Sequence, residues 1–355
     1  MTLSVAIVGC GFFSREHQRA WSRVRKARVV ALADADPAKA RAAAEAFPGA
    51  QVFAEAEAML DAVRPDVVDI VTPPATHRAL VAAAARRGIA AICQKPLAPT
   101  LADAVALVEE AEHAGATLII HENFRFMPWF QEARAILDKG LLGTPLGIFF
   151  RLRPGDGQGP QAYLGRQPYF QTMERFLVHE TAIHLIDVFR FLMGEATAVF
   201  ARLKRFNTVI AGEDAGVIAF DFQGGATGLF DGNRLVDHPS EDARMTMGIM
   251  FLEGTGGTLR LDGYGRLFLK PHGGEEREHP YAWTNAGYGG DCVFRQIEHT
   301  VPHLIDGAPV FNTGRDYLRN VEIEEAVYRS DAEKRLVEVS PIARSGGTSR
   351  RAERT

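Results

Sequence analysis

The sequence predicts an α/β domain with a parallel sheet, followed by an α+β domain with a large, mainly antiparallel open sheet. Three observations lead to this prediction. Short apolar runs alternate with alanine-rich stretches of helical length over residues 1–120, which is typical of βαβ units with right-handed crossovers. A length of 355 residues suits two cores rather than one. Between residues 196 and 269, short and roughly alternating runs are separated by glycine-containing turns, as in an antiparallel sheet.

The predicted strands of the first domain, residues 1–120, are continuous valine and isoleucine runs, which indicates burial on both faces of a parallel sheet. They are Ser4–Val8, Val29–Ala33, Val67–Val71, Ile89–Gln94 and Thr117–His121. Helices are predicted near Phe13–Arg25, Pro37–Phe47, Ala54–Val63, Thr76–Arg87 and Leu101–Ala114.

The second domain is expected over residues 121–340, with its helices on one face of the sheet. Its predicted strands are Thr197–Arg205, Ala215–Phe222, Thr227–Leu235, Thr246–Leu252, Thr258–Leu261 and Arg266–Leu269. Its predicted helices are Pro128–Lys139, Arg175–Met193, Cys292–Ile305 and Asp316–Ala332. Residues 341–355 are rich in Ser, Gly and Arg without apolar periodicity, so a disordered tail is expected there.

The bulk composition excludes several classes of protein. The net charge of −4 gives no reason to expect nucleic acid or an anionic membrane as a partner. Apolar runs stay short of the roughly 18 residues that a membrane span needs, and no basic region precedes a hydrophobic stretch as in a signal peptide. Cys10, Cys93 and Cys292 match neither a disulfide framework nor paired metal-ligand spacing. We therefore expect a cytoplasmic protein without a metal.

The first predicted strand leads directly into a glycine turn and a helix. Gly9 and Gly11 open the segment Gly-Cys-Gly-Phe-Phe-Ser, with Ser14 in the place of a third glycine. Glycine lets the backbone approach a pyrophosphate, and a helix N-terminus supplies free N–H groups and partial positive charge. Other G-x-G triplets lack this strand–helix context. We expect a Rossmann-type domain in which Gly9, Gly11, Phe12 and Phe13 bind a dinucleotide.

Asp34 ends the next predicted strand, 20 residues after Ser14 in the sequence. A carboxylate there accepts hydrogen bonds from the adenosine ribose and repels a 2′-phosphate. NAD is therefore expected in preference to NADP. The alternative is that Asp34 and Asp36 only cap the following helix.

Two further strands end in polar segments, Thr72-Pro73 with His77 nearby, and Gln94-Lys95. Ligands bind at the carboxyl ends of parallel strands, so all five residues are expected to contact the cofactor. A lysine that opens onto this crevice can also hold a substrate hydroxyl or assist a proton transfer. The alternative for Lys95 is a solvated surface lysine.

Together these motifs resemble the glucose–fructose oxidoreductase / inositol dehydrogenase / rhizopine-catabolism (Gfo/Idh/MocA) family. The resemblance extends over nearly the whole chain, through Asn123-Phe124-Arg125-Phe126 and Glu180…His184…Asp187. It implies sugars, inositols, related cyclic polyols or dihydrodiols as substrates. It also implies a homodimer or homotetramer that buries the broad sheet of the second domain.

The resemblance assigns roles to individual residues. Lys95 matches the lysine of the family's Glu-Lys-Pro motif, which is catalytic or orients the substrate, with Gln94 in place of the glutamate. Glu180 and His184 match an Asp and a His four residues apart on a helix of the second domain. The glycine pair that often precedes that helix is replaced by Glu174-Arg175-Phe176.

The spacing on the predicted helix Arg175–Met193 supports these roles. At 100° per residue, Glu180 and His184 lie about 40° apart, and Asp187 returns to the same stripe. Glu180 is therefore predicted to orient His184. His179 and His184 are five residues apart, so the spacing does not match a zinc-protease motif. The alternative for His184 is a core histidine bonded to Asp187 or to a backbone carbonyl.

The predicted function is an NAD(H)-dependent oxidoreductase that transfers hydride between nicotinamide and a secondary alcohol or ketone. His184 would accept the hydroxyl proton while Lys95 hydrogen-bonds the same oxygen. Asn123, Arg125 and Tyr169 are candidate substrate contacts, although Asn123 and Arg125 can equally form a buried structural pair. The alternatives are a reductase of imine-like substrates, an NAD-assisted glycosidase, a non-catalytic NAD-binding sensor or scaffold, and an unrelated function.

Overall fold

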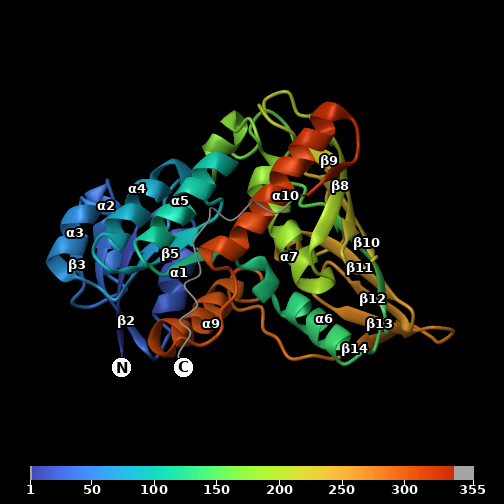
Figure 1. Ribbon diagram of the computed structural model, residues 1–355, viewed down its shortest axis with the longest axis horizontal. Helices are drawn as coiled ribbons and strands as arrows, with labels where there is room; N and C mark the ends of the chain where they lie inside the picture. Colours follow the sequence, from blue (N-terminus) through green and yellow to red (C-terminus); the bar gives the residue numbers. More distant parts are fainter. Residues whose placement is uncertain (1, 340–355) are drawn as a thin grey trace, which may run out of the picture.

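The computed structural model describes residues 2–339 and contains one sheet in each half of the chain (Figure 1). The tail predicted at residues 341–355 lies outside the described residues. Across residues 2–339, no helix combines the length and apolarity needed to cross a membrane.

The first sheet has six strands in the order β3-β2-β1-β4-β5-β6, and every neighbouring pair is parallel. Its order reverses between β1 and β4, and ligands bind outside the strand ends at such a switch point. The strands are β1 (Leu3–Val8), β2 (Ala27–Ala33), β3 (Gln51–Phe53), β4 (Val67–Ile70), β5 (Ala90–Gln94) and β6 (Leu118–His121). The helices are α1 (Ser14–Trp21), α2 (Pro37–Ala44), α3 (Ala56–Val63), α4 (Pro74–Ala85) and α5 (Leu101–His113).

The second sheet has nine strands in the order β14-β13-β12-β11-β7-β10-β9-β8-β15, and only β7 and β10 pair in parallel. Sequence analysis missed its central strand β7, and also β14, β15 and β3 of the first sheet. The bounds are β7 (Pro145–Leu152), β8 (Ala196–Lys204), β9 (Ala215–Phe222), β10 (Thr227–Asn233), β11 (Gly248–Gly254), β12 (Gly257–Leu261), β13 (Leu267–Pro271), β14 (Arg277–His279) and β15 (Val337–Glu338).

Helices cover the inner face of this sheet, toward the first domain, and leave its outer face bare (Figure 1). The alternation in β9 shows the same division, because Ile218, Phe220 and Phe222 are buried while Val217 and Asp221 are exposed. The helices are α6 (Pro128–Asp138), α7 (Ile183–Met193), α8 (Ala243–Thr246), α9 (Cys292–Asp306) and α10 (Gly314–Glu333), with short 3-10 turns at Phe124–Phe126 and Pro168–Thr172.

The last two long helices return to the first domain. Helix α9 packs against α1, and α10 contacts α5, α7 and β8. Tyr317, Leu318 and Val321 of α10 share a core with the first-domain strands. These helices therefore hold the two halves together and fix the edges of the cleft between them.

The structure corrects the helix predicted at Arg175–Met193. Only Ile183–Met193 is α-helical, and Leu177–Ala182 forms a π-helical turn. A π turn closes i→i+5 hydrogen bonds and is frequent at functional sites. The 100° per residue used to place Glu180 relative to His184 therefore does not hold there.

Candidate functional site

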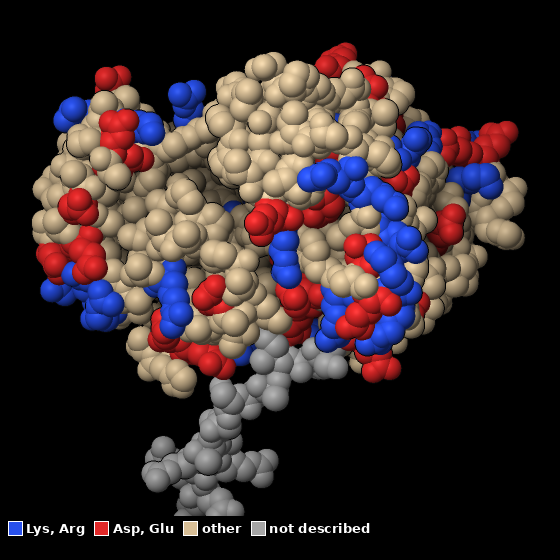
Figure 2. All heavy atoms as spheres, turned by 90° about the horizontal axis from the view of Figure 1, so that it is seen from above, with Lys and Arg blue, Asp and Glu red and all other residues tan. Residues whose placement is uncertain are grey.

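A cleft of about 1480 Å³ lies between the two domains, larger than the roughly 300–1,000 Å³ typical of a small-molecule pocket. Figure 2 shows a hollow between the two lobes, and Lys/Arg and Asp/Glu side chains intermixed around it. The residues that line the cleft come from the carboxyl ends of β4 and β5, the glycine turn after β1, and the second domain. The cleft therefore has more volume than one small ligand needs.

The glycine turn forms one end of this cleft. Gly9 has φ +93°, and a Cβ there would lie 2.3 Å from the Val71 carbonyl oxygen, so the turn packs too closely for any other residue. Gly11 faces open space, with no atom within 4 Å of the position of its Cβ. No side chain caps the N-terminus of α1, and residues 11–14 line the cleft. The open backbone and the uncapped helix N-terminus fit a pyrophosphate.

Asp34 braces this turn and is half-buried. Its carboxylate accepts hydrogen bonds from the backbone N–H of Cys10 at 2.7 Å and of Asp36 at 2.8 Å. The cap of α2 is Asp36, which accepts from Ala38 N–H. Asp34 does not line the cleft itself, so its contact with a ribose stays a prediction.

Four of the residues predicted after β4 and β5 line the cleft, namely Thr72, Pro73, Gln94 and Lys95. The structure contradicts a cofactor contact for His77. Its side chain is fully buried on α4, and its ring nitrogens lie 2.8 Å from the Thr72 carbonyl and 3.0 Å from the Leu97 carbonyl. Burial lowers the pKa of His77. This histidine therefore holds two cleft-forming loops together instead of touching a ligand.

Lys95 and Glu180 form an ion pair across the cleft. Lys95 Nζ donates to the Glu180 carbonyl at 2.7 Å and to Oε1 of its carboxylate at 3.1 Å. Burial alone would raise the pKa of Glu180, but the charges of Lys95 and Arg234 lower it to about 2. Glu180 is therefore a carboxylate at neutral pH, and its partner is Lys95.

His184 lines the cleft and stacks on Phe124, with 3.8 Å between ring centroids and 4° between ring planes. Its Nδ1 bonds to the Glu122 carboxyl, so the prediction that Glu180 orients this ring is wrong. Burial and the nearby Lys95 charge lower the pKa of His184 well below its usual value, and burial raises the pKa of Glu122. His184 is therefore a neutral imidazole whose Nε2 remains for a ligand.

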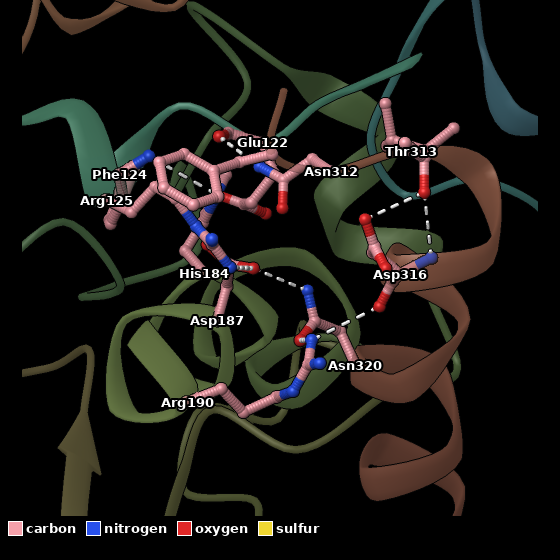
Figure 3. A network of polar contacts seen from close by, with 12 residues as sticks. Glu122, Phe124, Arg125, His184, Asp187, Arg190, Asn312, Thr313, Asp316 and Asn320 are labelled. Atoms are coloured by element: carbon pink, nitrogen blue, oxygen red, sulfur yellow. Dashed lines mark hydrogen bonds and ion pairs between the residues drawn. The ribbon is translucent and has the colours of Figure 1, made fainter. Parts of the chain in front are cut away.

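Arg125 also differs from its prediction as a substrate contact. It is buried away from the cleft and pairs in bidentate fashion with Asp187, at 2.6 and 2.5 Å. Figure 3 shows that Asp187 accepts a further hydrogen bond from Asn320 of α10, at 2.8 Å, and that Arg190 donates to Asn320 in turn. The pair is structural, because it ties the turn Phe124–Phe126 to α7, and Asn320 extends the network to α10.

The remaining predicted substrate contacts, Asn123 and Tyr169, do line the cleft. Tyr169 is 55% exposed, as suits a residue at an open rim. Asn123 Nδ2 lies 3.0 Å from Cys292 Sγ, so its amide is partly engaged.

Sequence reasoning missed several polar residues of the second-domain wall. Arg234 is buried, binds Asp156 at 2.8 Å, and reaches Glu180 Oε2 at 3.4 Å and Thr181 Oγ1 at 2.5 Å. Arg166 shares Asp156 at 3.1 Å. Arg234 directly follows β10 and Glu122 directly follows β6, and a charge directly after a strand was the available signal. Arg244 and Tyr288 also line the cleft.

No group of three or more His, Cys, Asp or Glu side chains within residues 2–339 is placed to hold a metal ion.

Comparison with known proteins gives matches over most of the chain. Residues 3–122 match the family model described as oxidoreductase family, NAD-binding Rossmann fold, and residues 130–260 match the GFO/IDH/MocA C-terminal domain. A D-apiose dehydrogenase of Paraburkholderia graminis is 38% identical over 345 residues, which is 95% of this chain and 90% of the relative. A second D-apiose dehydrogenase, from Rhizobium rhizogenes, is 34% identical and covers 96% of this chain and 98% of its own.

Solved structures give the same picture. A crystal structure of an oxidoreductase from Agrobacterium radiobacter in complex with NAD+, L-tartaric acid and magnesium superimposes with a TM-score of 0.88. It is 32% identical and covers 96% of this chain and 99% of its own.

Proposed function

Because the chain belongs to the Gfo/Idh/MocA family of oxidoreductases with an NAD-binding Rossmann fold, we propose that it is an NAD-dependent dehydrogenase of a sugar or related polyol. Family membership confirms the resemblance that the motifs indicate. The relatives named as D-apiose dehydrogenases support the substrate class. One observation carries the proposal, namely that the Lys95–Glu180 pair and His184 line the same cleft as an open glycine turn. A sensor or scaffold would need the turn but not the other three side chains.

In this proposal the two domains bind different ligands. Residues 1–120 hold the dinucleotide, with Gly9, Gly11, Phe12 and Phe13 at the pyrophosphate and Asp34 at the adenosine ribose. Thr72, Pro73 and the Gln94–Lys95 segment lie at the nicotinamide end. When bound, the nicotinamide ring supplies the hydride acceptor. Residues 121–340 supply the substrate wall.

In this scheme His184 takes the proton, and three other side chains support it. His184 Nε2 accepts the hydroxyl proton, which it can do because the ring is neutral. The Lys95 ammonium donates a hydrogen bond to the same substrate oxygen and stabilises its developing negative charge. Glu180 holds the Lys95 side chain in the cleft through their ion pair, and Glu122 holds His184 through Nδ1. Asn123 and Tyr169 contact the other hydroxyls of the substrate.

The test is a panel of aldoses, inositols, other cyclic polyols and diols offered with NAD and with NADP, followed by the absorbance of the reduced cofactor. We expect NAD reduction with at least one sugar or polyol, and little with NADP. Wild-type protein that binds NAD but reduces it with no member of the panel would contradict the dehydrogenase and favour a sensor.

We also propose that the protein is a homodimer or homotetramer that buries the outer face of the nine-stranded sheet. The strand register places Leu229, Phe149 and Phe251 side by side on this face, and the two phenylalanine rings stack at 6.3 Å between centroids. Leu229 is 38% exposed and Val217 42%. An apolar row of this kind on a bare sheet indicates an interface.

Sedimentation of the wild type against Phe149→Lys tests the assembly, and a monomeric wild type would contradict it. A cytoplasmic location is part of the same proposal, since Cys10, Cys93 and Cys292 are all free thiols, which suits a reducing compartment.

A further inference from the structure

A chain of buried hydrogen bonds runs beneath Lys95 and has no part in the proton transfer proposed above. It begins at Asp69 on β4, whose Oδ2 accepts from Trp21 Nε1 at 2.7 Å and lies 2.8 Å from His17 Nδ1. It continues from His17 Nε2 to Gln94 Nε2 at 2.9 Å. It ends where Gln94 Oε1 accepts the backbone N–H of Lys95 at 2.7 Å. His17 and Asp69 are wholly buried, and Gln94 is 5% exposed.

The direction of every hydrogen bond in this chain follows from its end. A backbone N–H only donates, so the atom of Gln94 that faces Lys95 is the amide oxygen. The amide nitrogen then faces His17 and donates, so His17 Nε2 must be the unprotonated ring nitrogen. His17 consequently carries its proton on Nδ1 and donates it to Asp69. One placement of protons satisfies all four contacts.

A glutamate at position 94 cannot satisfy them in the same way. Its carboxylate has no proton to donate, so it would set an oxygen lone pair against the lone pair of His17 Nε2. The contact becomes favourable only if one more proton is bound, either on His17, which then donates to the carboxylate, or on the new carboxyl group, which then donates to His17 Nε2. The other titratable groups near His17 are His121 on β6, at 4.2 Å between ring centroids, and Cys93 on β5, whose thiol senses the Asp69 charge.

Lys95 is therefore held at both ends. Gln94 fixes its backbone, and Glu180 fixes its ammonium from the other side of the cleft. We propose that the Asp69–His17–Gln94 chain is a positioning device that sets the backbone of Lys95 so that its ammonium meets the reacting oxygen. His17, Asp69 and Gln94 are positioning residues in this scheme, which rests on the role proposed for Lys95. The scheme also explains how glutamine functions where the family's motif has glutamate.

The experiment compares Gln94→Glu with the wild type by kcat and KM across pH 5.5 to 9. At high pH, Gln94→Glu should have a kcat lowered about 10- to 100-fold, the usual cost of removing an orienting partner, with a smaller change in KM for NAD. Its kcat should recover as the pH falls, because a proton bound by His17 or by the new carboxyl group restores a hydrogen bond between them. The wild type should lack this recovery. Gln51→Glu, which adds the same charge on the exposed strand β3, is the control and should behave as wild type.

Gln94→Met serves as the second variant, since it keeps the length of the side chain and adds no charge. It should lower kcat without creating the new pH dependence, and it remains informative if Gln94→Glu does not fold. A Gln94→Glu enzyme with wild-type kcat and a wild-type pH profile would overturn the proposal, as would a Gln94→Met enzyme with unchanged kcat. If Lys95→Met is fully active, the role proposed for Lys95 is wrong, and the positioning chain that rests on it is wrong as well. If Lys95→Met is inactive while both Gln94 variants match the wild type, only the positioning chain fails.

Discussion

The two walls of the cleft offer their ligands different chemistry. The first-domain wall presents mainly backbone, with an open Gly11, an uncapped helix N-terminus and loops held from behind by His77. The second-domain wall presents paired charges, in which Arg234 and Asp156 stand beside Glu180. The walls meet at the Lys95–Glu180 ion pair.

This difference has a consequence for substitutions. Backbone recognition tolerates changes of side chain, as with Ser14 in place of a third glycine. Buried charges do not, because removing one partner leaves the other unpaired. Variants of the first wall should therefore alter cofactor affinity, and variants at the meeting point should alter turnover.

The largest effect is expected from Lys95→Met. Loss of the ammonium removes the hydrogen bond proposed to the reacting oxygen and leaves Glu180 with one partner fewer, so kcat should fall about 10²- to 10⁴-fold. NAD affinity, measured by titration of the cofactor, should change little. Lys139→Met, at an exposed position after α6, is the control. Unchanged turnover in Lys95→Met would remove the lysine from the mechanism.

His184→Asn should lower kcat by about 10²-fold or more, because the proton acceptor is lost. Glu122→Gln should have a smaller effect, about 10- to 100-fold, because it only loosens the ring that Glu122 holds. Steady-state kinetics at saturating NAD measure both. Equal losses from the two variants would mean that Glu122 does more than hold the ring.

The pH dependence of kcat/KM gives a third test, of the second-domain wall of the cleft. His184 must be neutral to accept a proton, and burial holds its pKa well below the usual value near 6.5. Activity should therefore persist through pH 6.5 and be lost only at more acidic pH. A histidine-dependent loss of activity that sets in above pH 6.5 would contradict the assignment.

Asp34→Ala tests the first domain, which is proposed to bind the cofactor. Since we propose that the Asp34 carboxylate bonds the ribose, its removal should raise KM for NAD about 10-fold and narrow the preference for NAD over NADP, with kcat at saturating NAD nearly unchanged. Kinetics with both cofactors measure this. A large fall in kcat with no change in cofactor preference would place Asp34 among purely structural residues, as a brace of the glycine turn.

The smallest expected effect concerns stability. Burial lowers the pKa of His121 well below its usual value, so below pH 6.5 the unfolded chain binds a proton that the folded chain does not. Stability should consequently fall as the pH drops, by about 1 kcal/mol per such histidine at pH 5.5. The Tm of His121→Phe should depend less on pH between 7.5 and 5.5, whereas exposed His113→Phe should follow the wild type. If the Tm of the wild type and of His121→Phe fell equally with pH, the predicted contribution of His121 would be contradicted.

Residues that depend on short-range context were accessible from the sequence alone. A strand, a glycine turn and a helix follow one another within residues 3–21, so Gly9 and Gly11 could be identified without any long-range information. Lys95 was equally accessible, because it ends a buried strand. The parallel sheet, the NAD-binding domain and the family all follow from such local patterns, and the comparisons confirm them.

The partners of the side chains proposed to be catalytic were decided only by the tertiary structure. Glu122 and His184 are 62 residues apart, and Lys95 and Glu180 are 85 apart. No periodicity within one element can predict such pairs. The sequence analysis therefore predicted Glu180 as the partner of His184, and it predicted Arg125 as a substrate contact. Glu180 lies in the π turn Leu177–Ala182. Its direction relative to His184 therefore differs from the direction expected for a uniform α-helix. Local sequence determined which elements carry the functional side chains. The packing of α7, β6 and β10 determined which charged groups lie beside one another, because a buried charge is stable only beside a partner that the fold brings to it.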